Sequence, residues 1–252
     1  IREYEMKFLQ VICEMTEGSE VEIDDTGTSI KFKPGFIKGG KCEFDCDSVK
    51  CLTYFIQPLL PLLLFAKNPA TLKFKGSLVS ESELSIDALK FRIDPIFELL
   101  GVSLSVKVAS RSYSKTSQAI VSVDCIPIDS CLKAFDIQPS LKFSKVRGLL
   151  CSNKVNSQII NSIINESKEL LGNFFDDVYI YTENGNCDKS DNASGFNMVL
   201  ACTGVDNKLV VAEDLSHIDE SNPSKFVSKI CRRLLHNVAN KIIIDQQLSW
   251  SM

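Results

Sequence analysis

Apolar residues recur every three or four positions in four stretches of the chain, the spacing that places them along one side of an α-helix. The first stretch carries Tyr4 and Met15 at its ends and is followed by Gly18, a residue that commonly ends helices. The other three lie at residues 86–100, 159–171 and 226–238. Residues 52–66 form an almost continuous apolar run that we also expect to be helical despite its prolines. The pattern therefore predicts five helices.

Alternation of apolar and polar residues, which predicts strands with one buried face, occupies much of the remaining chain. Residues 20–23 and 29–32 alternate on either side of Asp24 and Gly27, whose chemistry suits a hairpin turn. We expect a glycine- and lysine-rich loop from there to Lys41. Further strands are predicted at residues 71–75, 102–108, 119–125, 178–181, 196–202 and 208–212, and residues 143–182 read as strand, helix, strand. Helices lying against mostly antiparallel sheets, the α+β class, fit this order best.

The composition is that of an ordinary globular protein, with 44% of the 252 residues hydrophobic and 24% charged. The formal net charge of −4 provides no overall positive field, so any RNA contact must come from a local patch or a partner. The longest apolar run, residues 54–65, is far shorter than the roughly 20 residues of a membrane span. We expect no association with a membrane.

Ten cysteines are scattered through apolar segments, a distribution that suits free thiols in a reducing compartment. Cys42, Cys46 and Cys51 fall close together. A structural zinc site needs four ligands with tighter pair spacing, however, and these three have no histidine nearby. We therefore expect neither a disulfide framework nor a metal site.

Residues suited to acid–base or metal-dependent catalysis are few. His236 lies late on the last predicted helix, where a polar residue beside a helix end is usually structural, and His217 is no better placed. Neighbouring carboxylates could hold magnesium for RNA cleavage, but adjacent residues on a strand point to opposite faces, which favours turn and cap roles. These pairs are Asp24-Asp25, Asp176-Asp177 and Glu213-Asp214. We expect no catalytic residue in this chain.

Two groups of basic residues are candidates for binding a phosphate or RNA. In the first group, exposed backbone amides and ammonium groups could converge on an anion. Lysine is normally exposed, however, so a solvent-exposed segment leaving the hairpin is the simpler interpretation. Its members are Lys31, Lys33, Lys38 and Lys41. The second group lies around an expected junction of two domains and could form a groove for RNA or an acidic partner segment, or simply be solvated surface. Its members are Arg111, Lys115, Arg147 and Lys154.

Five segments that together span nearly the whole chain resemble one family, the RNA 3'-terminal phosphate cyclases. They are Gly27-Thr28 with Lys33-Pro34-Gly35 and Gly39-Gly40, and residues 54–67, 84–101, 146–171 and 177–214. Within them, Leu84-Ser85-Ile86-Asp87 and residues 178–182 look more like the cyclase-like branch of the family than like the true cyclases.

The resemblance implies repeated strand–helix units similar to the C-terminal domain of a bacterial translation initiation factor, with a smaller thioredoxin-like domain inserted. On this plan residues 1–143 form the repeat domain, residues 144–238 form the inserted α+β domain, and residues 239–252 return to the repeat domain. The family's histidine would fall beyond Met252 and its N-terminal glycine-rich motif before Ile1. We therefore expect the chain to be part of a longer protein.

The chain departs from the family at two places that concern nucleotide binding. The family usually carries a Gly-Gly-Gly run between its two middle strands, where a backbone without side chains can approach a phosphate closely. Here the corresponding residues, 110–118, include no glycine. The segment that lines the cyclases' nucleotide pocket ends Ala-Asp-Gln-Leu, and its best match, residues 243–248, keeps only the Gln-Leu pair in register.

The cyclases use ATP to close a terminal RNA phosphate onto the neighbouring 2'-hydroxyl. The cyclase-like proteins lack this activity and serve in assembly of the small ribosomal subunit in the nucleolus, with a large GTPase as partner. The resemblance therefore implies a non-catalytic protein of small-subunit (18S) pre-rRNA processing in the nucleus and nucleolus. It would bind an assembly GTPase, with pre-rRNA as a second candidate partner, and would need no cofactor. An active cyclase using ATP and Mg, and a pre-rRNA endonuclease, remain open as alternatives, as does the oligomeric state.

Overall fold

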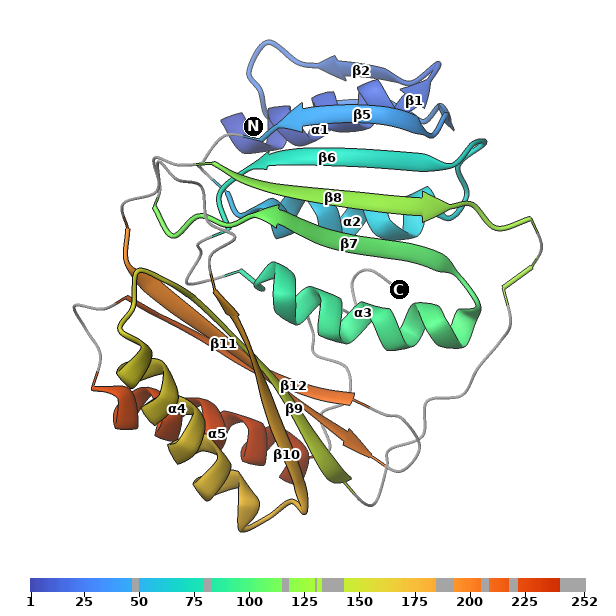
Figure 1. Cartoon of the computed structure of the whole chain (residues 1–252). Helices are drawn as coiled ribbons and strands as arrows, with labels where there is room; N and C mark the ends of the chain where they lie inside the picture. The colour runs from blue at the N-terminus through green and yellow to red at the C-terminus, as the bar shows by residue number, and fades with distance from the viewer. Residues whose placement is uncertain are drawn as a thin grey trace.

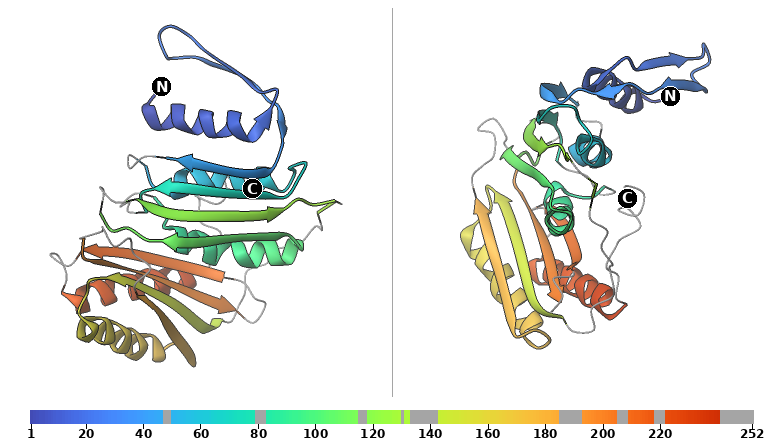
Figure 2. Two further views of the ribbon diagram at one scale, coloured as in Figure 1. Left: turned by 45° about the horizontal axis from the view of Figure 1, so that its top comes forward. Right: turned by 90° about the vertical axis from the view of Figure 1, so that its right-hand side faces the viewer.

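The computed structural model describes residues 1–46, 50–78, 83–114, 118–129, 131–132, 143–184, 193–204, 209–217 and 222–240, with the backbone alone for 184 and 209–217. Within these residues the strands form two four-stranded sheets and two short strand pairs (Figure 1). The described helices lie against the sheets, and one of them lies between the two (Figures 1 and 2). The prediction of an α+β protein is therefore confirmed.

The N-terminal part consists of an amphipathic helix and short strands. Helix α1 (Glu3–Met15) is followed by β1 (Thr16–Glu17), β2 (Glu20–Ile23), β3 (Ile30–Lys33) and β4 (Phe36–Ile37). The predicted hairpin is confirmed, since β2 and β3 pair antiparallel with Glu20 opposite Lys33, and it extends away from the body of the molecule (Figure 2). The predicted helix end at Gly18 is wrong, because the chain leaves the helix at Thr16 to pair β1 with β4.

The turn of this hairpin is organised by Asp24. Its Oδ1 accepts hydrogen bonds from the backbone N–H groups of Thr28 and Ser29, both at 2.8 Å. Together with the Thr26 hydroxyl, whose hydrogen bond is the largest cause, these donors lower the pKa of Asp24 to about 2. The turn role expected for this carboxylate is confirmed.

The first large sheet has the strand order β5-β6-β8-β7. Its strands are β5 (Gly40–Asp45), β6 (Ala70–Gly76), β7 (Ser103–Ser110) and β8 (Ala119–Ile126). Strands β5 and β6 run parallel, and the other two pairings are antiparallel. Because β4 and the start of β5 lie between the hairpin and Lys41, the loop predicted there is wrong. These strands were missed because their pairing partners, β1 for β4 and β6 for β5, lie outside the segment.

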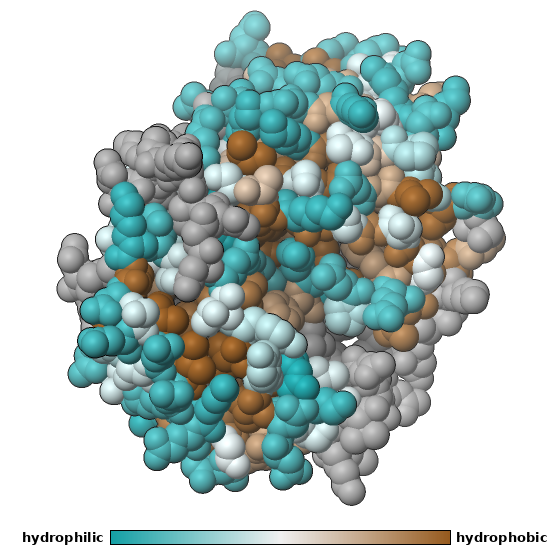
Figure 3. Space-filling view, in the orientation of Figure 1, coloured by the Kyte–Doolittle hydropathy of each residue, from teal (hydrophilic) through white to brown (hydrophobic). Residues whose placement is uncertain are grey.

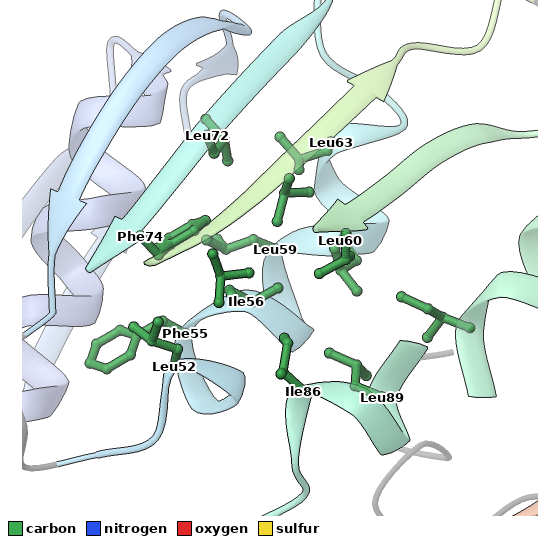
Figure 4. Packing of buried hydrophobic residues seen from close by; sticks show 14 of the residues in the cluster. Leu52, Phe55, Ile56, Leu59, Leu60, Leu63, Leu72, Phe74, Ile86 and Leu89 are labelled. Atoms are coloured by element: carbon green, nitrogen blue, oxygen red, sulfur yellow. The ribbon is translucent and has the colours of Figure 1, made fainter. Parts of the chain in front are cut away.

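One face of this sheet is covered by α2 (Leu52–Leu63), and the other faces solvent (Figure 1). Figure 4 shows how side chains of α2 pack against β6 and against the next helix. The members of this packing labelled there are Leu52, Phe55, Ile56, Leu59, Leu60, Leu63, Leu72, Phe74, Ile86 and Leu89. All of them are buried, so this stretch of apolar residues is a core helix, as its length suggested. None of the described helices combines the length and apolar character needed to cross a membrane.

Helix α3 (Ile86–Leu100) is bounded by the residues that its sequence favours. Ser85 caps its start, its Oγ accepting a hydrogen bond from the Ala88 N–H at 3.1 Å. Gly101 ends it in the left-handed conformation with φ of 70°, which glycine adopts without strain. The helix packs against β7 on one side and against the second sheet on the other. It thereby places its N-terminal turn at the junction of the two sheets.

The second sheet has the strand order β10-β9-β11-β12. Its strands are β9 (Phe143–Asn153), β10 (Asp177–Asn184), β11 (Gly195–Gly204) and β12 (Leu209–His217), with helices α4 (Ser157–Gly172) and α5 (Pro223–Ala239) on one face. The predicted strand–helix–strand run is confirmed as β9, α4 and β10, with β9 and β10 parallel. Ile160 and Ile163 of α4 enter the core between this face and the helices, whereas Val199 and Ala201 of β11 point to the opposite side, into the core around α3.

The sheets are mostly antiparallel, as expected, with one parallel pairing in each. Hydrophilic side chains cover much of the surface in Figure 3, with apolar patches between them over both sheets. The likeness to an initiation-factor domain and to thioredoxin stays a prediction, as do the domain bounds 1–143, 144–238 and 239–252. Residues 241–252 lie outside the described part of the chain, and the segment 243–248 with them.

Candidate functional site

The junction of the two sheets contains a buried ion pair between Asp87 and Arg111. Asp87 lies in the first turn of α3, and Arg111 follows the last residue of β7. The guanidinium donates two hydrogen bonds to the carboxylate, from Nη1 to Oδ2 at 2.7 Å and from Nη2 to Oδ1 at 2.8 Å. Only 3% of Asp87 and 6% of Arg111 is exposed. Such a two-bond pair fixes both the position and the plane of the guanidinium.

A second carboxylate reaches the same guanidinium from the other sheet. Nη2 of Arg111 also donates to Oε2 of Glu183, on β10, at 2.9 Å. Burial by itself would lower the pKa of Arg111, but its hydrogen bonds to Asp87 and the charges of Asp87 and Glu183 outweigh burial, and the pKa lies above its ordinary value. The guanidinium is therefore always charged, and its charge is met by two carboxylates.

A neutral chain of hydrogen bonds continues from Asp87. Its Oδ2 accepts from Nδ2 of Asn197 on β11 at 3.2 Å, and Oδ1 of Asn197 accepts from the Tyr113 hydroxyl at 2.7 Å. The Tyr113 ring lies so close to Gly195 that a Cβ there would stand 2.8 Å from its Cδ1. Tyr113, just after β7, is thus held against β11 by polar and packing contacts together.

Cys151 of β9 completes this group. Its Sγ lies 4.0 Å from Oδ2 of Asp87 and 3.8 Å from Oε2 of Glu183, in donor geometry to both. Burial raises the pKa of the thiol, and the charge of Asp87 adds to the rise, so the sulfur stays protonated at neutral pH. Because a thiol attacks as its thiolate, Cys151 is not placed to act as a nucleophile.

We refer to Asp87, Arg111, Tyr113, Cys151, Glu183 and Asn197 as the junction network. It offers one cation and two carboxylates, so its net charge repels a phosphate. Among the described residues, no group of three or more His, Cys, Asp and Glu side chains is arranged to hold a metal ion. The described cysteines, nine in number, are all free thiols. The arrangement can join elements firmly, and its thiol is kept in the protonated form.

The predicted lysine group is distributed over separate elements. Lys31 and Lys33 lie on the exposed strand β3 and pair across the hairpin with Glu22 at 3.0 Å and Glu20 at 2.8 Å. Exposed Lys38 lies between β4 and β5, and Lys41 lies on the solvent side of β5. Two of the four ammonium groups are thus engaged by carboxylates on the neighbouring strand.

The second predicted group is also spread out. Arg111 lies in the junction network, whereas Arg147 of β9 pairs with Asp177 of β10, at 2.9 Å from Nη1 to Oδ1 and 2.6 Å from Nη2 to Oδ2. Hydrogen bonding to Asp177 raises the pKa of Arg147. Lys154 follows β9 as an exposed residue with φ of 53°. Lys115 lies outside the described residues.

Sequence reasoning found only Arg111 of the junction network. Its partners were missed because Asp87 and Glu183 lie 24 and 72 residues away along the chain. The available signal was local: Asp87 is a charged residue on the apolar side of a predicted helix, next to buried Ile86 and Ala88. An acid in that position requires a buried partner, although its spacing does not say which one.

Comparisons of this chain with a family model and with individual known proteins agree on one family. A family model described as RNA 3'-terminal phosphate cyclase matches residues 1–250. An "RNA 3'-terminal phosphate cyclase-like protein" of Bos taurus is 28% identical over 241 residues, which is 93% of this chain and 64% of that protein. An rRNA processing protein of Schizosaccharomyces pombe is 27% identical over 248 residues, covering 97% of this chain and 68% of that protein. A "probable RNA 3'-terminal phosphate cyclase-like protein" of Caenorhabditis elegans is 30% identical over 219 residues, covering 86% of this chain. The chain spans less than two thirds of the cattle and nematode relatives, 64% and 58% of their lengths.

Proposed function

Since this chain belongs to the RNA 3'-terminal phosphate cyclase family, we propose that it acts in small-subunit pre-rRNA processing as a non-catalytic scaffold that binds an assembly GTPase and pre-rRNA. Two curated relatives, from fission and budding yeast, carry names that describe rRNA processing. Several others are named as cyclase-like proteins. Their names support a role in rRNA processing in the nucleus. The nucleolar site, the 18S precursor and the GTPase are what the cyclase-like branch implies.

The proposal that the protein is not a catalyst rests mainly on the pairing of Arg111 with two carboxylates. It stands at the start of the segment that connects β7 and β8, where the family's glycine run would cradle a phosphate. Here that connection has no glycine, and its one arginine is bound by Asp87 and Glu183. A phosphate at this place would have to displace a carboxylate from a buried cation, which costs several kcal/mol.

Side chains in place of the glycine run also hinder a phosphate from approaching the backbone N–H groups closely. Each neutral hydrogen bond to a phosphate contributes on the order of 1 kcal/mol, and charge-assisted bonds contribute more. A triphosphate held by several such hydrogen bonds would bind much more weakly where the glycines are replaced by residues with side chains. The expected loss of affinity for a triphosphate favours a protein that keeps the family's fold and uses its surface to bind partners.

Labelling with ATP tests the absence of catalysis. The full-length protein is incubated with Mg and ATP labelled in its adenylate moiety, and the denatured product is examined for covalent label. We expect no labelled band. A labelled band would return the protein to the active cyclases, the alternative that the family's name favours, with ATP and Mg as its cofactors.

Capture from nuclear extract tests the partner. Full-length protein carrying an affinity tag is expected to retain an assembly GTPase through washes of moderate salt, whereas a bead-bound unrelated acidic protein is not. Recovery of small-subunit pre-rRNA that disappears when the GTPase is removed would indicate that RNA arrives through the partner. Failure to retain any GTPase would defeat the scaffold proposal.

A further inference from the structure

Two neighbouring tyrosines are exposed on the second sheet. Tyr179 and Tyr181 lie two residues apart on β10, the edge strand, and are 50% and 52% exposed. Ile180 between them is 5% exposed and enters the core against α4 and α5. Because side chains alternate along a strand, both tyrosines lie on the opposite face of the sheet. Helix α3 covers that face of the sheet over β11 and β12, and the face is open at the two tyrosines.

The two rings form a compact aromatic surface. Their centroids are 4.6 Å apart and their planes meet at 66°, so the edge of one ring meets the face of the other. Neither ring is needed to fill the core, since the described core clusters contain neither residue. A pair of half-exposed rings on a rigid strand is therefore available to stack on a flat ligand.

Cations flank the tyrosines on both sides. From α4, the Nζ of Lys168 lies 5.6 Å from the centroid of the Tyr179 ring. On β9, Arg147 is the direct register neighbour of Tyr179, and Lys145 lies two residues further along the same face. Asp177 pairs with Arg147, so Lys145 and Lys168 supply the cations beside the rings.

We propose that Tyr179 and Tyr181 are a platform on which unpaired bases of single-stranded RNA stack, with Lys145 and Lys168 contacting the phosphates on either side. The inference rests on the proposed function and deepens it, because it names the surface that holds pre-rRNA. Aromatic rings take any base by its face, and basic side chains beside them follow the backbone. An acidic peptide would use the cations and gain little from the rings. Duplex RNA keeps its base faces covered by stacking and has none to offer.

Fluorescence anisotropy of a labelled twelve-nucleotide oligouridine, titrated with full-length protein, tests the platform. The double substitution Tyr179→Leu with Tyr181→Leu is expected to weaken binding by at least about tenfold, since each stacked base contributes strongly to affinity. The matched double substitution to phenylalanine keeps both rings and is expected to stay within about twofold of the unmodified protein. Phe36→Leu, at a largely exposed ring on β4 outside the platform, is expected to leave binding unchanged.

Competition identifies the kind of ligand. Unlabelled oligouridine is expected to displace the probe, and an oligoglutamate peptide of equal length and a duplex RNA are expected to displace it poorly. Three results would each overturn the platform. The leucine variant could bind the probe as tightly as the unmodified protein does, or the unmodified protein could fail to bind the probe. The third is that the peptide displaces the probe as effectively as RNA does. None of these results would alter adenylate labelling or capture of the GTPase, so failure of the platform is distinguishable from failure of the proposed function.

Discussion

The Arg111 guanidinium and the Asp87 carboxylate lie face to face, joined by hydrogen bonds of 2.7 and 2.8 Å, with almost no exposure to water. The pair connects the end of β7 to the first turn of α3. Glu183 then extends the connection to β10 in the second sheet. The buried Arg111 charge holds the end of β7, α3 and β10 in one arrangement. If one of these elements moved away, it would leave a buried charge without its partner, which is costly.

Removing the cation should be costly. Arg111→Met keeps the aliphatic stem but leaves the buried Asp87 carboxylate without its charged partner, which we expect to lower the free energy of unfolding by about 3–5 kcal/mol. Urea denaturation followed by circular dichroism measures the change. As a control, Lys31→Met removes an exposed pair with Glu22 and should cost less than about 1 kcal/mol. Equal decreases in the free energy of unfolding of the two variants would show that the buried pair stabilises the fold no more than the exposed pair does.

The hydrogen bond of Tyr113 should also be measurable. Tyr113→Phe removes the donor to Oδ1 of buried Asn197 and leaves that oxygen short of a partner, which we expect to cost about 1–2 kcal/mol. Thermal unfolding of the two proteins reports the difference. Tyr179→Phe, which alters an exposed hydroxyl, should leave the midpoint unchanged. A shift as large for Tyr179 as for Tyr113 would contradict this reading of the junction.

Two glycines with similar backbone angles should respond differently to alanine. Gly39 has φ of 75°, and a Cβ there would lie 2.0 Å from the backbone oxygen of Asn68. Gly18 has φ of 79°, with nothing within 4 Å of its Cβ position. We expect Gly18→Ala to cost about 1–2 kcal/mol from the left-handed conformation alone. Gly39→Ala should cost several kcal/mol more, because backbone must move. Urea midpoints of both variants check this, and a smaller loss at Gly39 would disprove it.

Alkaline pH should destabilise the fold through its buried thiols. Burial raises the pKa of Cys125 and Cys231 to about 11 and that of Cys202 to about 12. The unfolded chain ionises its thiols from about pH 8.5, while the folded chain keeps these protons. Stability is therefore full below that pH and falls as the pH rises toward the folded values, by up to about 1.4 kcal/mol per pH unit for each thiol.

Urea denaturation between pH 7 and pH 10 measures this slope. Cys202→Ala should make the slope shallower, whatever it does to stability at pH 7. Cys131→Ala, at an exposed thiol, should leave the slope as it was. A slope that does not change with Cys202→Ala would rule out its contribution.

The local predictions succeeded where a segment's neighbours in sequence are also its neighbours in space. The helix stripes, the stop at Gly101 and the hairpin around Asp24 depend on contacts within a few residues. The prediction failed for residues 33–41, because strand formation there depends on pairing partners elsewhere. Thr16 of β1 lies opposite Ile37, and Ala70 of β6 lies opposite Gly40.

Residue pattern alone, through the periods of 3.6 and 2 that the two kinds of backbone impose, indicated the helices and most of the strands. The family was indicated by the resemblance of particular segments, and the family model agrees with it. Only the tertiary structure decided that Asp87, Arg111 and Glu183 share one buried charge network, and that Tyr179 and Tyr181 remain uncovered where α3 ends its contact with the sheet. The physical reason is that burial and charge pairing depend on what surrounds a side chain from every direction. The order of residues along the chain specifies those surroundings only through the complete fold.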